Sequence, residues 1–556
     1  MSDRIPTATP PAGETSSELE CFPYSVHHAD EGVCLLVRMG PYRILLDCGI
    51  EDISILKKGK RSLPADLVLC SHAHPDHAQG LFALHQAFPS LPIYASEATT
   101  QLLPLNWLGT NQIPQFCQAL PWRSPVEFQD GLSAELFPAG HLPGAAAILL
   151  TYTTPQRTYS LLYTGDFFLS NSRLVEGMPL DELRRLKPDV LIIEGSYGTA
   201  RHPHRRTQEN QLAERINRAI TQGHCVLMPT PTLGIGQEIL MLLRSHHSFT
   251  GRDLDIWVDG MVAAGCDAYL KMLPQLPAPV QNFARHQPLF WDERVRPRMR
   301  KITHQQRPDI GKLPCIIITD ESADLERYCQ PQTGPWLILL PEKPGRLLPH
   351  PQSLPELVPQ PSPLVPPTIV ETYLLAQHSD GPGITQLIHN LRPQHVIFVH
   401  GSPAYLADLT GLDELQNRYH LHSPANGTIV DLPVGDTFIQ PAAPETNYEG
   451  ELNELGTVIT ITLPEAIIAD PRWRVFADTG LVEARWQGEE LVIRGLSQRE
   501  LLNQTSDRLI ASEVSCCATC KFQRGQRCLN QASPLFGFKV TPEGYCPVYE
   551  RNSNEE

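Results

Sequence analysis

The chain of 556 residues contains no apolar run that approaches the ~20 residues needed to cross a bilayer. Its first twenty residues are rich in Pro, Thr, Ser and Glu and lack the apolar core of a signal peptide. These absences predict a cytoplasmic protein with no membrane partner. Basic residues are also in the minority. The formal net charge of −16 argues against indiscriminate nucleic-acid binding, although a local basic track can exist on an acidic body.

The fourteen cysteines do not form a secreted disulfide framework. Nine lie singly from Cys21 to Cys329 and are expected to be buried as small hydrophobic residues. The other five lie in residues 511–556, as Cys517-x2-Cys520-x7-Cys528-x17-Cys546 with an additional Cys516. So short a segment builds little core, and in a reducing compartment a metal cross-link is favoured over disulfides. Four thiolates suit a structural Zn²⁺ and a [4Fe-4S] cluster alike.

A dense polar cluster is the most informative feature that the chain does contain. The segment His72-Ala73-His74-Pro75-Asp76-His77 follows the apolar run 67–70, which predicts a buried strand. Polar side chains beside a buried strand need partners, and a metal supplies them. The first two histidines alternate and can point to one side, whereas the aspartate and the last histidine turn towards a neighbouring point. This spacing favours two adjacent ions over one.

Further candidate ligands end other strand-like runs. Asp47 follows 44–46, His141 lies in 138–144, Asp166 follows 161–165 and His400 follows 396–399. A single Asp or His beside Gly at a strand end is more often a turn residue. Taken together and in this order, these four residues indicate a metal centre that is assembled from several strand ends.

At these residues the chain resembles the metallo-β-lactamase superfamily, over most of residues 20–200 and again from near 370. The resemblance implies an α/β protein, an αββα sandwich of two mixed sheets with helices outside and metals at one sheet edge. It implies one Zn²⁺ on His72, His74 and His141. The second Zn²⁺ would lie on Asp76, His77 and the bridging Asp166, and Asp47 would orient the loop.

Three more segments resemble the β-CASP branch, which includes RNase J and the cleavage endonuclease of the polyadenylation machinery. They are Glu194 in 192–198, His378 in 376–380, and His400, 22 positions further on. The resemblance implies that His400 completes the second metal site and that His378, held by Glu194, is the general acid. Asp76 is then both a ligand and part of the catalytic set. A two-metal site lowers the pKa of a bridging water, and a histidine can protonate the leaving sugar oxygen.

Two positions depart from this family. The family segment usually carries Gly-Arg, then one residue, then Gln-Glu, whereas residues 234–238 read Gly-Ile-Gly-Gln-Glu, and Ser402 stands where relatives often have Glu. Both departures leave the hydrolytic residues intact, but they weaken the inference that the substrate is RNA. Candidate phosphate contacts are six arginines in the proposed insertion, and the alternative is a solvated charged face: Arg201, Arg205, Arg206, Arg294, Arg296 and Arg298.

The expected domain organisation has six parts. They are a flexible N-terminus (1–18), the first part of the metallo-β-lactamase domain (19–198), a β-CASP insertion (199–368), the return of the first domain (369–444), a small β-rich module (445–510) and a Cys-rich metal-binding module (511–556). Helices are expected at 209–220, 239–243 and 380–391, and strands at 225–229 and 369–374. Short strands are expected at 458–463, 475–477, 481–486 and 491–494. Docking or homodimerisation is the default role of the β-rich module.

These observations support three hypotheses. The first is a di-zinc phosphodiesterase that cleaves RNA; endonucleolytic and 5′-exonucleolytic activities both occur in the resembled family. The second is a hydrolase of the same fold that acts on a small ester or phosphoester. The third is a non-catalytic scaffold for RNA processing, which would be expected to have lost ligands, and none is lost here.

Overall fold

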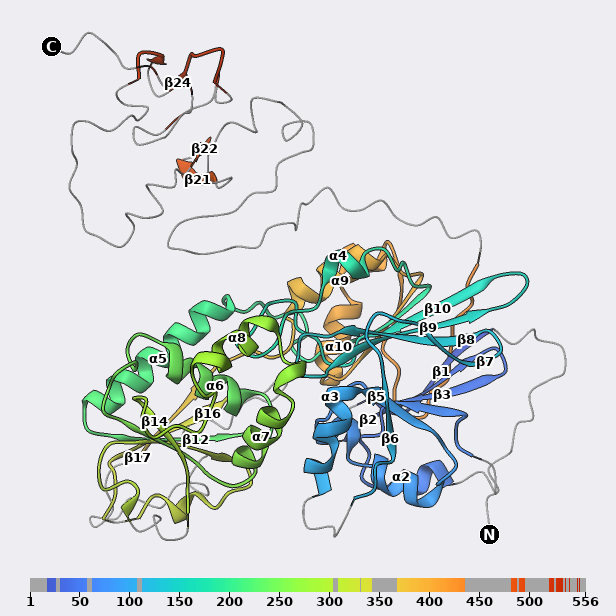
Figure 1. Ribbon diagram of the computed structural model, residues 1–556. Coiled ribbons are helices and arrows are strands. Elements are labelled where there is room, and N and C mark those ends of the chain that lie inside the picture. The colour runs from blue at the N-terminus through green and yellow to red at the C-terminus, as the bar shows by residue number, and fades with distance from the viewer. Residues whose placement is uncertain are drawn as a thin grey trace. The chain divides into compact units, whose positions relative to one another are not determined.

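The computed structural model describes two parts of the chain. The N-terminal part comprises residues 18–26, 31–57, 63–107, 113–303, 309–330, 332–342 and 368–435, and the C-terminal part comprises 482–487, 490–495, 520–524, 527–533, 536, 540, 548 and 550. The chain divides into two compact units, Met1–Ala443 and Pro444–Glu556. Within its described residues the first unit holds two seven-stranded sheets and one six-stranded sheet (Figure 1).

The two seven-stranded sheets form a sandwich. In spatial order, sheet A consists of β20 (Val430–Asp431), β1 (Leu19–Val26), β2 (Val33–Met39), β3 (Tyr42–Leu46), β4 (Leu67–Leu69), β5 (Ile93–Ser96) and β6 (Cys117–Leu120). Sheet B consists of β19 (His420–His422), β18 (His395–Val399), β11 (Val190–Glu194), β10 (Thr158–Tyr163), β9 (Ala146–Thr153), β8 (Leu132–Pro138) and β7 (Val126–Gln129). Both sheets mix parallel and antiparallel pairs.

Alternation along the strands explains why the sheets stack. In β3, Ile44 and Leu46 belong to the cluster between the two sheets, whereas Leu45 belongs to the outer cluster beneath the helices. In β11, Val190 and Ile192 point into the sandwich and Leu191 points outward. Because both faces of these strands are buried, they read as continuous apolar runs rather than as apolar–polar alternation.

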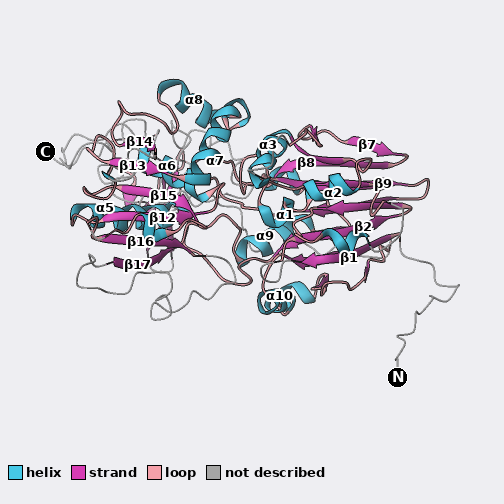
Figure 2. Ribbon diagram, turned by 90° about the horizontal axis from the view of Figure 1, so that it is seen from below, coloured by secondary structure: helices cyan, strands magenta, loops and turns pink. Residues whose placement is uncertain are grey.

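Helices cover the outer faces (Figures 1 and 2). Those of the sandwich are α1 (Pro75–Ala78), α2 (Leu81–Ala87), α3 (Glu97–Leu102), α4 (Leu180–Leu183), α9 (Gly381–Leu391), α10 (Pro403–Thr410) and α11 (Asp413–Gln416), with the 3-10 turns η1 (Ile53–Lys57) and η2 (Leu103–Trp107). The αββα architecture that the resemblance implied is therefore confirmed.

Sheet C forms the inserted α/β domain, and all its strand pairs are parallel. Its strand order is β14 (Arg298–Lys301), β13 (Asp255–Val258), β15 (Ile316–Asp320), β12 (Cys225–Thr230), β16 (Trp336–Pro341) and β17 (Thr368–Tyr373). Its helical elements are α5 (Arg205–Thr221), α6 (Ile235–Ser245), α7 (Gly260–Lys271), α8 (Ala278–His286), η3 (Leu273–Gln275) and η5 (Leu325–Arg327). The exact domain boundaries given above remain predictions.

The predicted elements of this region are present with shifted ends. The helix expected at 209–220 begins at Arg205, and the helix expected at 239–243 spans Ile235–Ser245. The helix after the His378 loop begins at Gly381 because the Asp380 carboxylate caps it, accepting from the Gly383 amide at 3.0 Å. All nine single cysteines are buried, as predicted.

The second unit contains two hairpins among its described residues. β21 (Val482–Gln487) pairs with β22 (Glu490–Gly495), and β23 (Gln523–Arg524) pairs with β24 (Arg527–Cys528). The strands expected at 458–463 and 475–477 lie outside the described residues. Across the whole described chain, no helix combines the length and apolar character that a membrane crossing requires.

Candidate active site

The candidate residues gather where parallel strands end together. β3 and β4 are parallel neighbours in sheet A, and β10, β11 and β18 are parallel neighbours in sheet B. The carboxyl ends of parallel strands meet at one edge of a sheet. Each of these strand ends delivers a polar side chain to that edge, and the five are Asp47, His72, Asp166, Glu194 and His400.

Two of these strand ends turn sharply at the functional residue itself. Asp47 has φ 58° and His400 has φ 53°, which places both non-glycine residues in the left-handed region. Such conformations cost free energy and are held only by the surrounding structure. Gly49 lets the Asp76 segment approach, since a Cβ at position 49 would lie 1.7 Å from the Asp76 carbonyl oxygen. The turn after β3 therefore brings residues 47–49 against the ligand segment 72–77.

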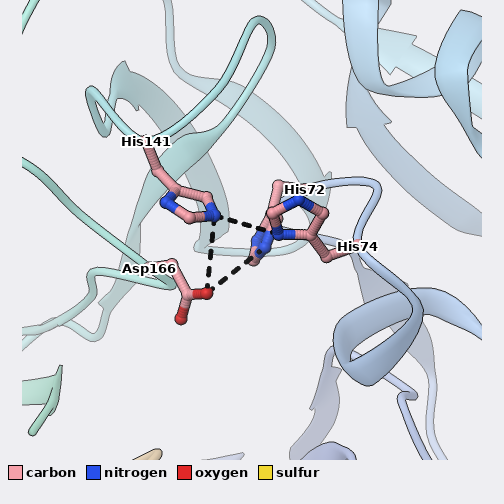
Figure 3. A group of neighbouring side chains, drawn as sticks. All are labelled: His72, His74, His141 and Asp166. Carbon is pink, nitrogen blue, oxygen red and sulfur yellow. Dashed lines mark hydrogen bonds and ion pairs between the residues drawn. The ribbon is translucent and has the colours of Figure 1, made fainter. Parts of the chain in front are cut away.

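The first group comprises His72, His74, His141 and Asp166 (Figure 3). Their ligand atoms all lie within 4.8 Å of one another. The Asp166 Oδ2 atom is 3.5 Å from His72 Nε2 and 3.6 Å from His141 Nε2. His74 Nδ1 faces His141 Nε2 at 3.0 Å.

Hydrogen bonds assign the protons on these rings. His141 Nδ1 donates to the Gln377 carbonyl at 2.8 Å, and His74 Nε2 is 3.4 Å from the Leu233 carbonyl. Carbonyl oxygens only accept, so these nitrogens carry the protons and the other nitrogen of each ring carries a lone pair. The lone pairs of His74 Nδ1 and His141 Nε2 thus face each other, an arrangement that needs a cation between them.

The second group comprises Asp76, His77, Asp166 and His400, again within 4.8 Å. The Asp166 Oδ1 atom is 3.2 Å from His77 Nε2 and 3.5 Å from His400 Nε2, and Asp76 Oδ2 is 3.3 Å from His400 Nε2. Asp166 is the member that the two groups share. One oxygen of its carboxylate faces each group, the arrangement expected of a bridging ligand.

The donor atoms fit bound metal ions. Within the described residues, His72 Nε2, His77 Nε2 and Asp166 Oδ1 are buried and have no hydrogen-bond partner, a costly condition that coordination would relieve. Burial lowers the pKa values of His72, His74 and His141, so their rings are neutral ligands. Imidazole nitrogens and carboxylate oxygens are preferred donors to Zn²⁺.

His77 behaves differently because two carboxylates flank it. Burial opposes the charge on this ring, but Asp166 and Asp47 outweigh burial and raise the pKa of His77 well above its usual value. A proton and a metal ion compete for the same Nε2 atom. Metal binding at the second group should therefore release a proton.

Asp47 holds the ligand loop from behind. Its side chain is fully buried, and its Oδ2 accepts from Ser71 Oγ at 2.7 Å, His77 Nδ1 at 2.7 Å and Tyr163 Oη at 2.6 Å. Because the Ser71 hydroxyl proton goes to Asp47, the Ser71 oxygen accepts from His72 Nδ1 at 3.0 Å. Asp47 thus sets the orientation of His77 directly and of His72 through Ser71.

His378 lies beside these groups and is held by Glu194. His378 Nδ1 is 2.8 Å from Glu194 Oε2 and 3.8 Å from Asp166 Oδ2. Burial disfavours a charged imidazole, but Glu194 and then Asp166 outweigh it and raise the pKa of His378 to about 9. Glu194 also accepts from the Phe167 amide at 2.6 Å, which fixes its carboxylate.

Comparison with known proteins agrees with this geometry. Residues 42–225 match the family model described as "Beta-lactamase superfamily domain", and residues 365–414, which include His378 and His400, match "Zn-dependent metallo-hydrolase RNA specificity domain". The chain is 49% identical over 553 residues to "Uncharacterized protein sll0514" of Synechocystis sp., covering 98% of this chain and 99% of that one.

Two archaeal relatives from Methanocaldococcus jannaschii are more distant. "Probable RNase MJ4" is 31% identical over 250 residues, 41% of this chain and 56% of the relative. "RNase J-like protein" is 27% identical over 305 residues, 51% of this chain and 67% of the relative. The chain belongs to the β-CASP branch of the metallo-β-lactamase superfamily. It is a zinc-dependent metallohydrolase.

In this β-CASP protein a cleft of about 680 Å³ runs between the sandwich and the inserted domain. The sandwich contributes Asp76, Asp166, His378 and His400, and the carboxyl ends of β12 and β15 contribute Thr230 and Asp320. Figure 2 shows sheet C beside the sandwich, with α3 and α7 adjacent at their junction, and these two helices are in contact. The insertion thus forms one wall of the site.

The predicted phosphate-binding arginines are not among the described residues that line this cleft. The prediction that Arg205 binds a substrate phosphate is wrong. Its side chain is 7% exposed and pairs with Glu209 and Glu238, each at 3.3 Å. Because the adjacent Glu238 also accepts from Ser172 and Leu174, Arg205 stabilises the junction of the two domains rather than a substrate phosphate. Arg201 and Arg206 are exposed.

The second basic segment lies at β14, an outer strand of sheet C, and is paired with acids. Arg298 contacts Asp253 and Asp255, each at 2.6 Å. Arg294 and Arg296 lie 3.7 Å from Asp292 and 3.8 Å from Asp253. This arrangement matches the alternative of a solvated charged face, so the structure does not bring Arg294, Arg296 and Arg298 to the cleft.

The two departures from the family pattern have structural roles. Ile235, which stands where the family pattern predicts arginine, is the first residue of α6 and lines the cleft. The hydroxyl of Ser402 accepts from the Tyr405 amide at 3.3 Å and caps α10. Of the four predicted C-terminal ligands, Cys520 and Cys528 are described, whereas Cys517 and Cys546 lie outside the described residues.

Sequence reasoning missed the serines that support the ligands. Ser71 immediately precedes His72, and Ser196 lies two residues after Glu194. Both hydroxyls contact a carboxylate and an imidazole at once. Their position beside a motif residue was a usable signal, but serine is also common in turns, so position alone does not distinguish the two roles.

Proposed function

We propose that this protein is a di-zinc ribonuclease in which His378 is the general acid. The main observation behind this proposal is that two ligand groups share Asp166. In addition, His378 is paired with Glu194, and its Nδ1 atom lies 3.8 Å from Asp166 Oδ2. The RNA-specificity family match covers His378 and His400, and two relatives are named as RNases.

Each residue of the site has a separate proposed role. His72, His74 and His141 would hold one zinc ion, Asp76, His77 and His400 the other, and Asp166 would bridge them. Bound there, the pair would supply an activated water and neutralise charge on the scissile phosphate. His378, kept protonated by Glu194, would give its proton to the leaving oxygen. The cleft would place the phosphate between the two walls.

A direct assay tests this proposal. Zinc-loaded protein is incubated with RNA labelled at the 5′ or the 3′ end, beside His74→Ala and His378→Ala. We expect cleavage by the wild type that both variants lose, and the two labels distinguish endonucleolytic from 5′-exonucleolytic action. Cleavage no faster than that of the variants would contradict a ribonuclease.

One observation favours the second candidate, a hydrolase of a small ester or phosphoester. Among the described residues that line the cleft there is neither Lys nor Arg, and Asp320, Glu321 and Glu342 line its β-CASP side. A polyanion would meet these carboxylates, whereas a small substrate would contact the metal side alone. Hydrolysis of a small phosphodiester without any RNA cleavage would favour this candidate.

A variant of Glu194 tests how the acid is held. Because Glu194 is a major cause of the raised pKa of His378, Glu194→Gln should lower that pKa. The acid works protonated, so activity falls as pH rises through its pKa. We therefore expect the alkaline limb of the kcat profile of Glu194→Gln to move to lower pH than in the wild type. An unmoved alkaline limb would show that Glu194 does not support the charge on His378.

We also propose that the C-terminal cysteines Cys517, Cys520, Cys528 and Cys546 bind a metal, either structural Zn²⁺ or a [4Fe-4S] cluster. Two measurements on anaerobically purified protein distinguish them. A brown protein that absorbs at about 400 nm indicates the cluster. A colourless protein with one zinc more than the active site holds indicates Zn²⁺. The absence of both signals would refute a metal role for these cysteines. Homodimerisation through the β-rich module remains a prediction.

A further inference from the structure

Ser196 joins a metal ligand to the carboxylate that holds the acid. Its side chain is buried, its Oγ donates to Glu194 Oε2, and the same Oγ lies 2.8 Å from His400 Nδ1. An ionised carboxylate only accepts, so the hydroxyl proton goes to Glu194 and the Ser196 oxygen accepts from His400. This fixes the proton of His400 on Nδ1.

The consequence lies at the other nitrogen of the ring. With its Nδ1 atom held by Ser196, His400 directs Nε2 towards Asp76 Oδ2 at 3.3 Å and Asp166 Oδ1 at 3.5 Å. These are the other members of the second ligand group. Ser196 therefore selects the tautomer of His400 that can bind metal.

Ser71 provides the comparison inside the same site. Its hydroxyl also donates to a buried carboxylate, Asp47, and accepts from a ligand, His72. The other partners of Asp47 are the Ser71 amide, the Tyr163 hydroxyl and the ligand His77, whereas Glu194 accepts from His378 Nδ1 at 2.8 Å. Of the two serine–carboxylate pairs, only that of Ser196 contacts the candidate acid, His378.

We propose that Ser196 is a positioning residue that couples the second metal site to the proton donor. The chain His400–Ser196–Glu194–His378 makes the orientation of the acid depend on a ligand that is correctly placed for metal. The effect on zinc binding follows from the geometry alone, and the effect on turnover rests on the proposed role of His378.

The test compares Ser196→Ala, Ser196→Thr and Ser160→Ala. Without the hydroxyl, the His400 Nδ1 proton is buried and unpaired, so Ser196→Ala should bind one of its zinc ions about 10–100-fold more weakly, as a chelator competition measures. At saturating zinc its kcat should remain about tenfold below that of the wild type with KM little changed. Threonine keeps the hydroxyl, so Ser196→Thr should restore both quantities.

Ser160→Ala is the matched control, because the Ser160 hydroxyl also donates to a carboxylate, that of Asp189, at 3.2 Å. This pair lies at the amino ends of β10 and β11, whereas Asp166 and Glu194 lie at their carboxyl ends. It should keep wild-type zinc affinity and kcat. Wild-type zinc affinity in Ser196→Ala would overturn the ligand half of the proposal. Full recovery of kcat at saturating zinc would overturn the coupling. If the protein cleaves no RNA, the chelator titration still decides the ligand half.

Discussion

Replacing Asp166 by asparagine should leave less than about one of the two proposed zinc ions per chain and abolish hydrolysis. Asp166 is the one residue common to both four-residue ligand groups, and its two carboxylate oxygens face different histidines. The other ligands include only one further carboxylate, Asp76, so the variant would gather five imidazoles around two dications with a single negative charge. We expect the zinc content to fall from about two ions per chain to less than about one.

Metal analysis after dialysis and an activity assay measure this outcome. Asp189→Asn is the control, because Asp189 lies on the same sheet beyond the amino end of β11 and accepts from Ser160 and Arg157 away from the cleft. That variant should keep its zinc and its activity. A folded Asp166→Asn protein that retains two zinc ions would show that the carboxylate does not bridge them.

Replacing His378 by alanine should leave both zinc ions in place and lower kcat by about 10²–10⁴-fold. His378 lines the cleft but belongs to neither four-residue ligand group, and it pairs with Glu194. In the proposed mechanism, its loss removes the proton for the leaving oxygen while the ligands remain. The measurement is kcat on a metal-replete protein with the zinc content determined in parallel.

His389→Ala is the control for the loss of a buried imidazole. His389 lies in α9, is 5% exposed and is paired with the Tyr419 hydroxyl at 3.0 Å, outside the described lining of the cleft. This variant should lose stability but keep kcat. Normal turnover in zinc-loaded His378→Ala would remove His378 from the acid role, whereas loss of zinc would make it a ligand instead.

The candidate site shows which functional residues the local sequence pattern could predict. The segment 72–77 and the strand-terminal residues Asp47, Asp166 and His400 were recognisable because polar side chains at the ends of apolar runs are costly without partners. The left-handed backbone of Asp47 and His400 was not recognisable, because glycine is the usual residue for such turns and neither position is glycine.

The arginines show where pattern fails. Arg205 and Arg298 look alike in sequence, as members of basic clusters in an insertion. In the fold, Arg205 is buried between two glutamates at the domain junction, and Arg298 lies on an outer strand between two aspartates. Which acid a long basic side chain meets depends on contacts between distant segments, so charge clustering alone could not assign these residues.

The sequence alone determined the candidate ligands of this protein, their order and the strands that carry them, because the spacing of apolar runs and polar ends is a local property. Only the tertiary structure decided which atoms meet. Asp166 faces two ligand groups, and Ser196, beside Glu194, contacts His400, which lies 204 positions further along the chain. Such contacts depend on the register of parallel strands that pair across long crossovers, and no local pattern specifies that register.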